Sequence, residues 1–169
     1  MAIRQIVTIP NKILNRKARK VTDFGQEFQE LVDDMIETMR DAPGTGLAGP
    51  QVNESLRVLV VEFGDEEDET ILPKLYVLAN PEISRKSRET VLGTEGCLSI
   101  PDYVAEVDRP TGITIKAQNR YGQKTKIKAK GWLARIFQHE IDHLNGILIL
   151  DIAERVFKLE DLQPEEAEE

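Results

Sequence analysis

The chain has 169 residues, of which 40% are hydrophobic and 31% are charged, and its formal net charge is −8. This composition is typical of a globular protein and excludes a disordered one, so we expect residues 1–169 to form a single domain. The acidic charge argues against direct, sequence-specific nucleic-acid binding, and no apolar run approaches the roughly 20 residues that cross a bilayer, which excludes a membrane span.

An amphipathic helix is expected over residues 23–40. Its apolar side chains recur at spacings of three and four residues, namely Phe28, Leu31, Val32, Met35, Ile36 and Met39. Thr22 or Asp23 is placed to cap the first turn. Pro43 and Gly44 supply the stop, because proline cannot continue the helical hydrogen-bond ladder and glycine tolerates the turn that follows.

Strands are expected in the middle of the chain. Arg57–Phe63 contains Val58–Val61, a run too short for a typical helix and rich in branched side chains, which predicts a buried strand. A second strand is expected over Leu75–Asn80, where Pro81 should end it.

An antiparallel hairpin is expected further along the chain. Gly112–Ala117 and Lys124–Ala129 both alternate apolar and polar residues, and the turn signal Asn119–Gln123 separates them. The acidic end of the chain, from about 160 to 169, is expected to be a frayed tail.

The helical period returns after Gly131 and predicts a last long helix that ends before Asn145 and Gly146. Strands in the middle of the chain with helices toward both ends predict an α+β fold. We expect mixed, mainly antiparallel sheets packed around this last helix, together with the N-terminal helix.

The only two histidines, His139 and His143, lie four positions apart in this helix, around Glu140. These positions share one helix face, so both imidazoles can point at one metal ion while Glu140 reaches a water bound to it. A catalytic site of this kind needs three protein ligands and one open position. Cys97 is the sole thiol in the chain, and we take it as the third ligand.

A thiolate and two imidazoles suit Zn, Fe(II), Co or Ni, with selection left to geometry and supply. Glu140 is expected to act first as general base and then as general acid. Asp142 has two interpretations: it could orient a ligand by pairing with Arg109, or belong to a structural ion pair only.

Other interpretations of these residues stay open. The histidine pair could be ordinary hydrogen-bonded core, and a lone cysteine is often a small buried hydrophobe. The His139–His143 pattern also supports a metallopeptidase that cuts internal peptide bonds. A non-catalytic metal-binding module is a further alternative, but it would need a fourth protein ligand that the sequence does not obviously supply.

Three segments resemble the peptide deformylase family in order, spacing and content. They are Gly-Thr-Gly-Leu-Ala-Gly-Pro-Gln at 44–51, Glu-Gly-Cys-Leu-Ser at 95–99 and Gln-His-Glu-Ile-Asp-His-Leu at 138–144. The resemblance covers nearly the whole chain, to about Leu150. It implies an enzyme that removes the N-terminal formyl group from nascent polypeptides that begin with formylmethionine and releases formate.

The resemblance also implies the composition of the site. Cys97, His139 and His143 would hold one ion per chain, most actively Fe(II), with Zn, Ni or Co able to substitute. Metal-bound hydroxide would attack the formyl carbon, and Glu140 would handle the proton. The Gln51 side-chain amide and the backbone N–H of Leu98 would meet the developing oxyanion.

Substrate contacts are expected from the glycines of two of these segments and, for the first side chain, from the same resemblance. An extended peptide could pair as an added strand with the backbone near Thr45 and Gly96, where Gly46 allows a close approach. The methionine side chain would enter an apolar pocket beside the metal helix. Ile136 is our candidate for that pocket, with Leu133 and Phe137 as further candidates, and a core role for each is an equal alternative.

The remaining expectations concern partners and location. Formylated nascent chains at the ribosome are the expected transient partner, a monomer is favoured, and no membrane contact is expected. A single cysteine and an N-terminus without a long apolar run favour a reducing cytoplasm.

Two features depart from the family pattern. Where the family usually has Leu-Ala-Ala-Pro-Gln, this chain has Gly49 in the third position, and loss of that methyl group is expected to loosen the loop that carries Gln51. Relatives that dock on ribosomes through a C-terminal helix use basic residues, whereas this chain ends in acidic ones, so that docking mode is not transferred.

Overall fold

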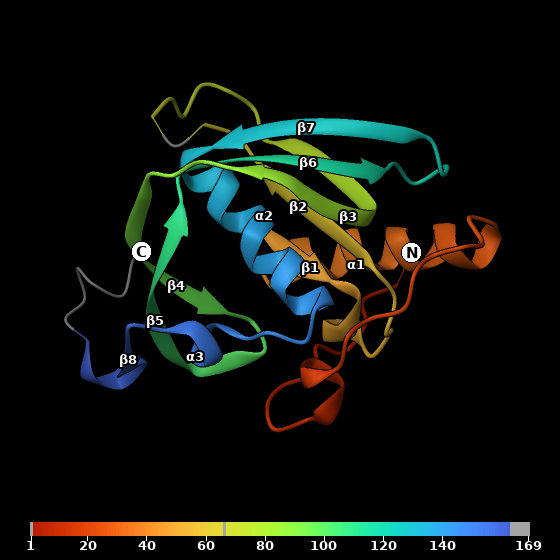
Figure 1. The fold of residues 1–169 in the computed structure, drawn as a ribbon. Coiled ribbons are helices and arrows are strands. Elements are labelled where there is room, and N and C mark those ends of the chain that lie inside the picture. The colour runs from red at the N-terminus through yellow and green to blue at the C-terminus, as the bar shows by residue number, and fades with distance from the viewer. Residues whose placement is uncertain (1, 66, 163–169) are drawn as a thin grey trace.

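The computed structural model describes residues 2–65 and 67–162, and within them it contains two antiparallel sheets with a helix between them (Figure 1). The elements are η1 (Lys12–Asn15), α1 (Gln26–Asp41), β1 (Gly46–Ala48), η2 (Gly49–Val52), β2 (Val58–Phe63), β3 (Lys74–Lys86), β4 (Thr90–Cys97), β5 (Ile100–Pro110), β6 (Gly112–Gln118), β7 (Lys124–Lys130), α2 (Gly131–Leu144), α3 (Ile149–Ile152), β8 (Arg155–Lys158) and η3 (Leu159–Asp161). The larger sheet has the order β1-β2-β3-β6-β7, and the smaller sheet has the order β4-β5-β8. The predicted α+β fold with mainly antiparallel sheets is confirmed.

The end of the chain and the number of domains are not settled by the described residues. The expected frayed tail lies mostly at 163–169, outside the described residues, and the preceding stretch forms η3. The single domain stays a prediction. In the described part of the chain, no helix combines the length and apolar character that crossing a bilayer requires.

The predicted N-terminal helix is present as α1, but it begins three residues later than expected. Gly25 occupies the N-cap position, so the expected capping by Thr22 or Asp23 is wrong. The Asp23 side chain instead accepts a hydrogen bond from the Gly25 N–H at 2.9 Å. Its oxygen is therefore committed to a local turn before the helix, a common alternative to capping for aspartate.

Strand β2 confirms the predicted buried strand and explains its apolar run. Val58 and Val60 pack in the cluster that includes α1, whereas Leu59 and Val61 pack in the cluster that includes α2. Successive side chains of a strand point to opposite faces. Since a helix covers each face, β2 is apolar at every one of these positions.

Strand β3 runs past Pro81 to Lys86, so the expected end at Pro81 is wrong. The pairing register with β6 shifts between Ala79 and Glu82, and Asn80 has a φ of 50° there. Proline lacks the N–H that a regular ladder needs, and a bulge is a position where that donor is not required. The strand therefore continues beyond the irregularity.

The predicted hairpin is confirmed as β6 and β7, which are antiparallel and joined by a turn in which Gly122 has a φ of 81°. One face of β6 is buried, whereas the alternate residues of β7 are exposed lysines, namely Lys124, Lys126, Lys128 and Lys130. Strand β7 is the last strand of the larger sheet, so these lysines lie along its edge.

The predicted last helix is confirmed as α2, which ends at Leu144 and is followed by Gly146 with a φ of 74°. Figure 1 shows α2 running between the two sheets. Its side chains Ala134, Phe137 and Ile141 are buried in the cluster that β2 and β6 share. This packing fixes the position of α2 and therefore of the side chains on its other face, which point toward the smaller sheet.

Gly49 begins the 3₁₀ helix η2 and has neighbours close to the position of a side chain. A Cβ atom there would lie 2.7 Å from the carbonyl oxygen of Leu56 and 2.8 Å from that of Glu54. The Glu54 N–H also donates to the Gly49 carbonyl at 3.0 Å. The missing methyl group leaves no void, because the backbone of the next turn occupies its place.

We expect Gly49→Ala to lower the free energy of unfolding by about 1–3 kcal/mol, because the added methyl group must displace backbone atoms in a buried loop. Urea titration of the two proteins measures the difference. Gly112→Ala is the matched control, since a Cβ there has its nearest neighbour at 3.7 Å. An equally or more stable Gly49→Ala variant would contradict this account, since a glycine-to-alanine change without strain usually stabilises.

Candidate metal centre and cleft

A cleft of about 510 Å³ lies between edge strand β1 of the larger sheet and edge strand β4 of the smaller sheet, with α2 beside it. Residues from three distant parts of the chain line it together. The predicted site residues among them are Thr45, Gly46, Gln51, Gly96, Cys97, Leu98, Ile136, His139 and Glu140. The remaining predicted residue, His143, lies deeper and is 1% exposed.

The three predicted metal ligands converge. One donor atom each from Cys97, His139 and His143 lies within 4.8 Å of the others, and Cys97 Sγ is 3.4 Å from His143 Nε2. A sulfur and a nitrogen bound tetrahedrally to one ion are about 3.6 Å apart when their bonds are about 2.3 and 2.1 Å long. The donor set and its spacing therefore fit a divalent transition metal.

The Glu140 side chain packs against Gly46 of β1, which has no side chain of its own. A Cβ on Gly46 would be 2.6 Å from Glu140 Oε2 and 2.9 Å from its carboxyl carbon. The other carboxylate oxygen, Oε1, is buried without a hydrogen-bond partner among the described residues. The glycine thus makes room for a carboxylate that keeps a free acceptor in the cleft.

Both polar atoms of the Gln51 side-chain amide have hydrogen-bond partners. Its Oε1 accepts a hydrogen bond from the Ala48 N–H at 3.0 Å, and its Nε2 donates to Ser99 Oγ at 3.1 Å. The same Nε2 lies 3.8 Å from Cys97 Sγ. This arrangement leaves the second N–H of Nε2 facing the predicted ligand Cys97, and the side chain is only 2% exposed.

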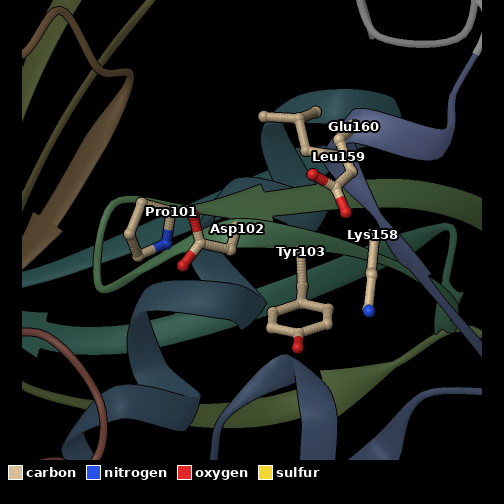
Figure 2. A pocket seen from close by; sticks show the side chains of 6 residues that line it. All are labelled: Pro101, Asp102, Tyr103, Lys158, Leu159 and Glu160. Carbon is tan, nitrogen blue, oxygen red and sulfur yellow. The ribbon is translucent and has the colours of Figure 1, made fainter.

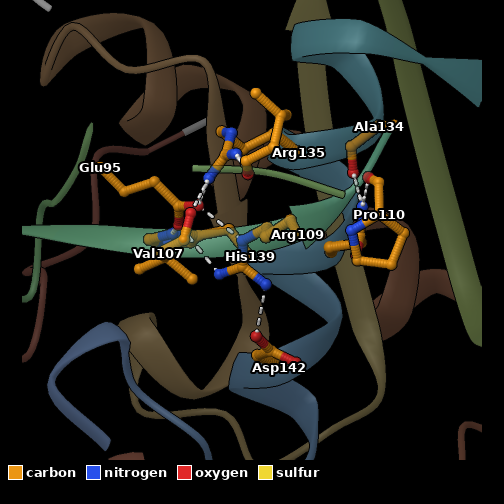
Figure 3. A network of polar contacts seen from close by, with 10 residues as sticks. Glu95, Val107, Arg109, Pro110, Ala134, Arg135, His139 and Asp142 are labelled. Atoms are coloured by element: carbon orange, nitrogen blue, oxygen red, sulfur yellow. Dashed lines mark hydrogen bonds and ion pairs between the residues drawn. The ribbon is translucent and has the colours of Figure 1, made fainter. Parts of the chain in front are cut away.

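A buried ionic network supports His139 from behind (Figure 3). The Glu95 carboxylate is 2.9 Å from His139 Nδ1 and accepts two hydrogen bonds from Arg109, from Nε at 2.5 Å and from Nη2 at 2.9 Å. Arg135 Nη1 donates to the same carboxylate at 2.6 Å. A carboxylate on the outer nitrogen of a metal-binding imidazole fixes the tautomer and the ring orientation.

Asp142 joins this network through Arg109, whose Nη1 donates to Asp142 Oδ2 at 2.9 Å. Arg109 therefore links Asp142 to Glu95, and Glu95 contacts His139, a predicted ligand. The pairing of Asp142 with Arg109, one of the two interpretations from the sequence, is present and leads to a ligand through Glu95.

Burial and charge shift the pKa values of the two site carboxylates in opposite directions. Burial raises the pKa of Glu140 to about 7. Burial would also raise the pKa of Glu95, but the hydrogen bonds from His139 and Arg109 outweigh it and lower that pKa to about 2. Glu95 is thus an anion at neutral pH, whereas Glu140 can exchange a proton near neutral pH.

The two histidines also differ. Burial lowers the pKa of His139, but its contacts with Cys97 and Glu95 outweigh burial and hold the pKa well above the usual value. Burial and the charge of His139 lower the pKa of His143 well below that value.

The cleft wall contains residues that sequence reasoning assigned no role. Trp132 and Arg135 line the cleft from α2, and Ser99 holds the Gln51 amide from the β4–β5 turn. Leu133 and Phe137 pack instead in the core, where the Phe137 ring meets the Tyr76 ring edge to face. Ile136 belongs both to that core and to the cleft wall.

A second cavity of about 470 Å³ lies beside the β4–β5 turn, where Pro101 lines both cavities. Figure 2 shows its lining, which includes the charged side chains Asp102, Lys158 and Glu160. The cysteine and histidine donors are in the lining of the first cleft or behind it. The candidate centre is therefore in the cleft between β1 and β4.

Comparisons with known proteins agree on one family. The sequence profile described as polypeptide deformylase matches residues 3–158. The peptide deformylase of Natranaerobius thermophilus is 45% identical over 161 residues, which are 95% of this chain and 99% of that protein.

Solved structures give the same result. The peptide deformylase of Thermotoga maritima superposes with a TM-score of 0.84 at 36% identity, over 92% of this chain and 100% of that one. The class I type b peptide deformylase of Acinetobacter baumannii, in a structure with bound Met-Ala-Ser, gives a TM-score of 0.82 at 34% identity, over 89% of this chain and 98% of that one.

We expect Glu95→Gln to weaken metal binding by about 10- to 100-fold, because the substitution removes the anion that orients His139. It should also lower the free energy of unfolding by about 3–5 kcal/mol, since Arg109 and Arg135 lose their buried counter-charge. Competition with a chromophoric chelator for Ni(II) measures the first effect, and urea titration measures the second.

Glu69→Gln, an exposed change in the β2–β3 loop, is the control for Glu95→Gln and should alter neither quantity. Unchanged Ni(II) affinity in Glu95→Gln would show that the carboxylate does not support the ligand.

Proposed function

The chain belongs to the polypeptide deformylase family and is an enzyme that hydrolyses N-formyl peptides, and from this premise we propose how its own residues perform the reaction. The proposed substrate is a nascent polypeptide with N-terminal formylmethionine, met transiently at the ribosome, and the products are formate and a free amine. Family membership argues against the two alternatives, an internal peptidase and a non-catalytic metal module.

One observation carries the proposal. Three metal-ligating side chains, a carboxylate with a free oxygen and a fixed amide donor meet at the same cleft, between two strand edges that can pair with a peptide. Each group has a part in the hydrolysis of an amide, and together they come from three separate elements, β4, α2 and η2.

Cys97, His139 and His143 are the proposed ligands. Fe(II) is the proposed ion, one per chain, and Zn, Ni or Co would substitute because the same donors suit each of them. When bound, the ion supplies a Lewis acid and lowers the pKa of a coordinated water to near neutrality. Glu95 keeps the outer nitrogen of His139 engaged and so leaves the inner nitrogen free to act as ligand.

Glu140 is the proposed general base and, afterwards, the general acid. Burial places its pKa at about 7, close to the value at which a carboxylate can both accept and return a proton at neutral pH. It would take a proton from the attacking water and deliver it to the departing amine nitrogen. Its unpartnered Oε1 is available for both transfers.

Gln51 and Leu98 are the proposed oxyanion donors. The Ala48 N–H fixes the Gln51 side chain by its oxygen and Ser99 accepts one amide hydrogen, so the other N–H of Nε2 is the donor that would face the reacting centre. Leu98 lies directly after the ligand Cys97, in the turn to β5, where its backbone N–H can reach the same region. Neither donor titrates, so the site keeps the same donors across the working pH range.

The peptide is proposed to lie as an added strand between β1 and β4. Thr45 and Gly46 line one side of the cleft and Gly96 the other, and both strands are sheet edges there. Main-chain pairing would accept many sequences after the first residue. Ile136 and Trp132 offer apolar surface to the first side chain, and the relative from Acinetobacter baumannii holds a peptide that begins with methionine.

We expect metal-loaded protein to release formate from a short formyl-methionyl peptide, and Glu140→Gln to keep its metal while kcat falls by about 10²- to 10⁴-fold. Glu69→Gln serves as the exposed control. A coupled formate assay and metal analysis of the same samples measure both quantities. Failure of the Fe- or Ni-loaded protein to release formate would refute the proposed activity, and loss of metal from Glu140→Gln would refute the role of Glu140.

We expect Gly46→Ala to lower kcat by about 100-fold, because the new methyl group overlaps the position of Glu140 Oε2 and must push the carboxylate aside. Metal content should stay at the wild-type level, since the three atoms nearest to the added methyl group all belong to Glu140 and not to a proposed ligand. Gly112→Ala is the matched control, and steady-state kinetics give the comparison. A Gly46→Ala enzyme with wild-type kcat would show that the placement of Glu140 does not limit the rate.

A further inference from the structure

Arg135 is a buried cation in the cleft wall that no step of the proposed reaction uses. It lies on α2 one turn before His139 and is 4% exposed. Its Nη1 donates to Glu95 Oε2 at 2.6 Å and to the Val107 carbonyl at 2.9 Å, and its Nη2 donates to the Val91 carbonyl at 2.7 Å. The guanidinium is therefore fixed to β4 and β5 by three hydrogen bonds.

The position of this guanidinium depends on Gly93 of β4. A Cβ on Gly93 would lie 2.7 Å from Arg135 Cζ and 2.9 Å from both Nε and Nη2. The glycine is not in the left-handed region of backbone conformation, so the strand itself does not require it there. What requires it is space, because Arg135 occupies the volume that a side chain at 93 would fill.

Glu95 is contacted by two arginines as well as by His139. Arg109 contacts both carboxylate oxygens, Arg135 contacts Oε2, and His139 Nδ1 contacts Oε1. These contacts use about all of the roughly four acceptor sites of a carboxylate. The carboxylate cannot rotate without breaking a charge-assisted bond to one arginine or the other.

We propose that Arg135 is a positioning residue for the metal centre: the missing side chain at Gly93 gives it space, and together with Arg109 it holds Glu95 and thereby fixes the ring of His139. The inference rests on the proposed function only in assigning His139 as a metal ligand. Arg135 acts through Glu95 and does not touch the reacting atoms. Both Nη nitrogens donate to protein groups, so we expect its effect to reach the metal through Glu95 and not to reach the peptide.

The first test is the metal affinity of Arg135→Met and Arg135→Lys, measured by competition for Ni(II) with a chromophoric chelator. Arg135→Met should bind Ni(II) about 10- to 100-fold more weakly. Arg135→Lys keeps the charge but cannot reach Glu95 and both carbonyls together. Its affinity for Ni(II) should therefore lie between those of the wild type and Arg135→Met. On the Ni-loaded enzymes, kcat should fall in the same order while KM stays within about twofold of wild type.

The second test uses the fit between Gly93 and Arg135 and leaves Glu95 and the ligands untouched. Gly93→Ala should weaken Ni(II) binding by displacing the guanidinium. In an Arg135→Ala background the same change meets no guanidinium and should have no further effect. Such non-additivity is expected for two residues that act through one contact, whereas equal effects of Gly93→Ala in both backgrounds would overturn the proposal.

Arg120→Met is the matched control for loss of a networked arginine. Arg120 binds Gln29 and Asp33 at the β6–β7 turn, among residues that do not line the cleft. Its loss should lower the free energy of unfolding and leave Ni(II) affinity unchanged. If Arg135→Met behaves like Arg120→Met, Arg135 is structural only and the proposal fails.

The remaining outcomes are also decisive. A rise in KM with unchanged Ni(II) affinity would assign Arg135 to the substrate and overturn the proposal. Wild-type protein that binds Ni(II) but releases no formate would refute the proposed activity, yet the affinity series would still test Arg135. The two failures are therefore distinguishable.

Discussion

The buried carboxylate of Glu95 is the group on which the rest of the site depends. It comes from β4, its arginine partners come from β5 and α2, and its histidine partner is a proposed metal ligand on α2. Burying a charge is costly unless it is paired and hydrogen-bonded, and a partly satisfied network is worse than an apolar core. The smaller sheet and the central helix are thus held in one relative position by the same contacts that orient His139.

The predictions from sequence succeeded where the evidence was local. The hydrophobic periods of α1, α2 and the β6–β7 hairpin each lie within a short stretch of sequence, so these elements were predictable. Strand β2 was predictable too, because a helix covers each of its faces and it therefore has a continuous apolar run. The two histidines and Glu140 share one helix turn, and their juxtaposition follows from helical geometry alone. Cys97 is predicted as the third ligand because the chain has no other thiol. The structure brings its sulfur together with donor atoms of His139 and His143.

The elements that sequence reasoning missed are those with an unusual interior. Strands β4 and β5 turn the charged residues Glu95 and Arg109 inward, so the alternation of apolar and polar residues that marks a strand is broken at those buried positions. Their buried charges are stable only because partners arrive from α2, a contact that no local window contains. The same holds for Arg135 and Gly93, whose fit becomes visible only when the helix is placed against the strand.

The sheet edges of this molecule are used in two opposite ways. Strands β1 and β4 present their unpaired edges to the cleft, where a peptide is proposed to add as a strand. Strand β7 is also an edge, but its alternate exposed residues are lysines about 6.8 Å apart. Two copies that met along β7 would bring like charges together, a recognised protection against aggregation through sheet extension. The fold can therefore leave the edges of β1 and β4 open to a peptide, while the lysines of β7 oppose pairing between copies of the protein along that edge.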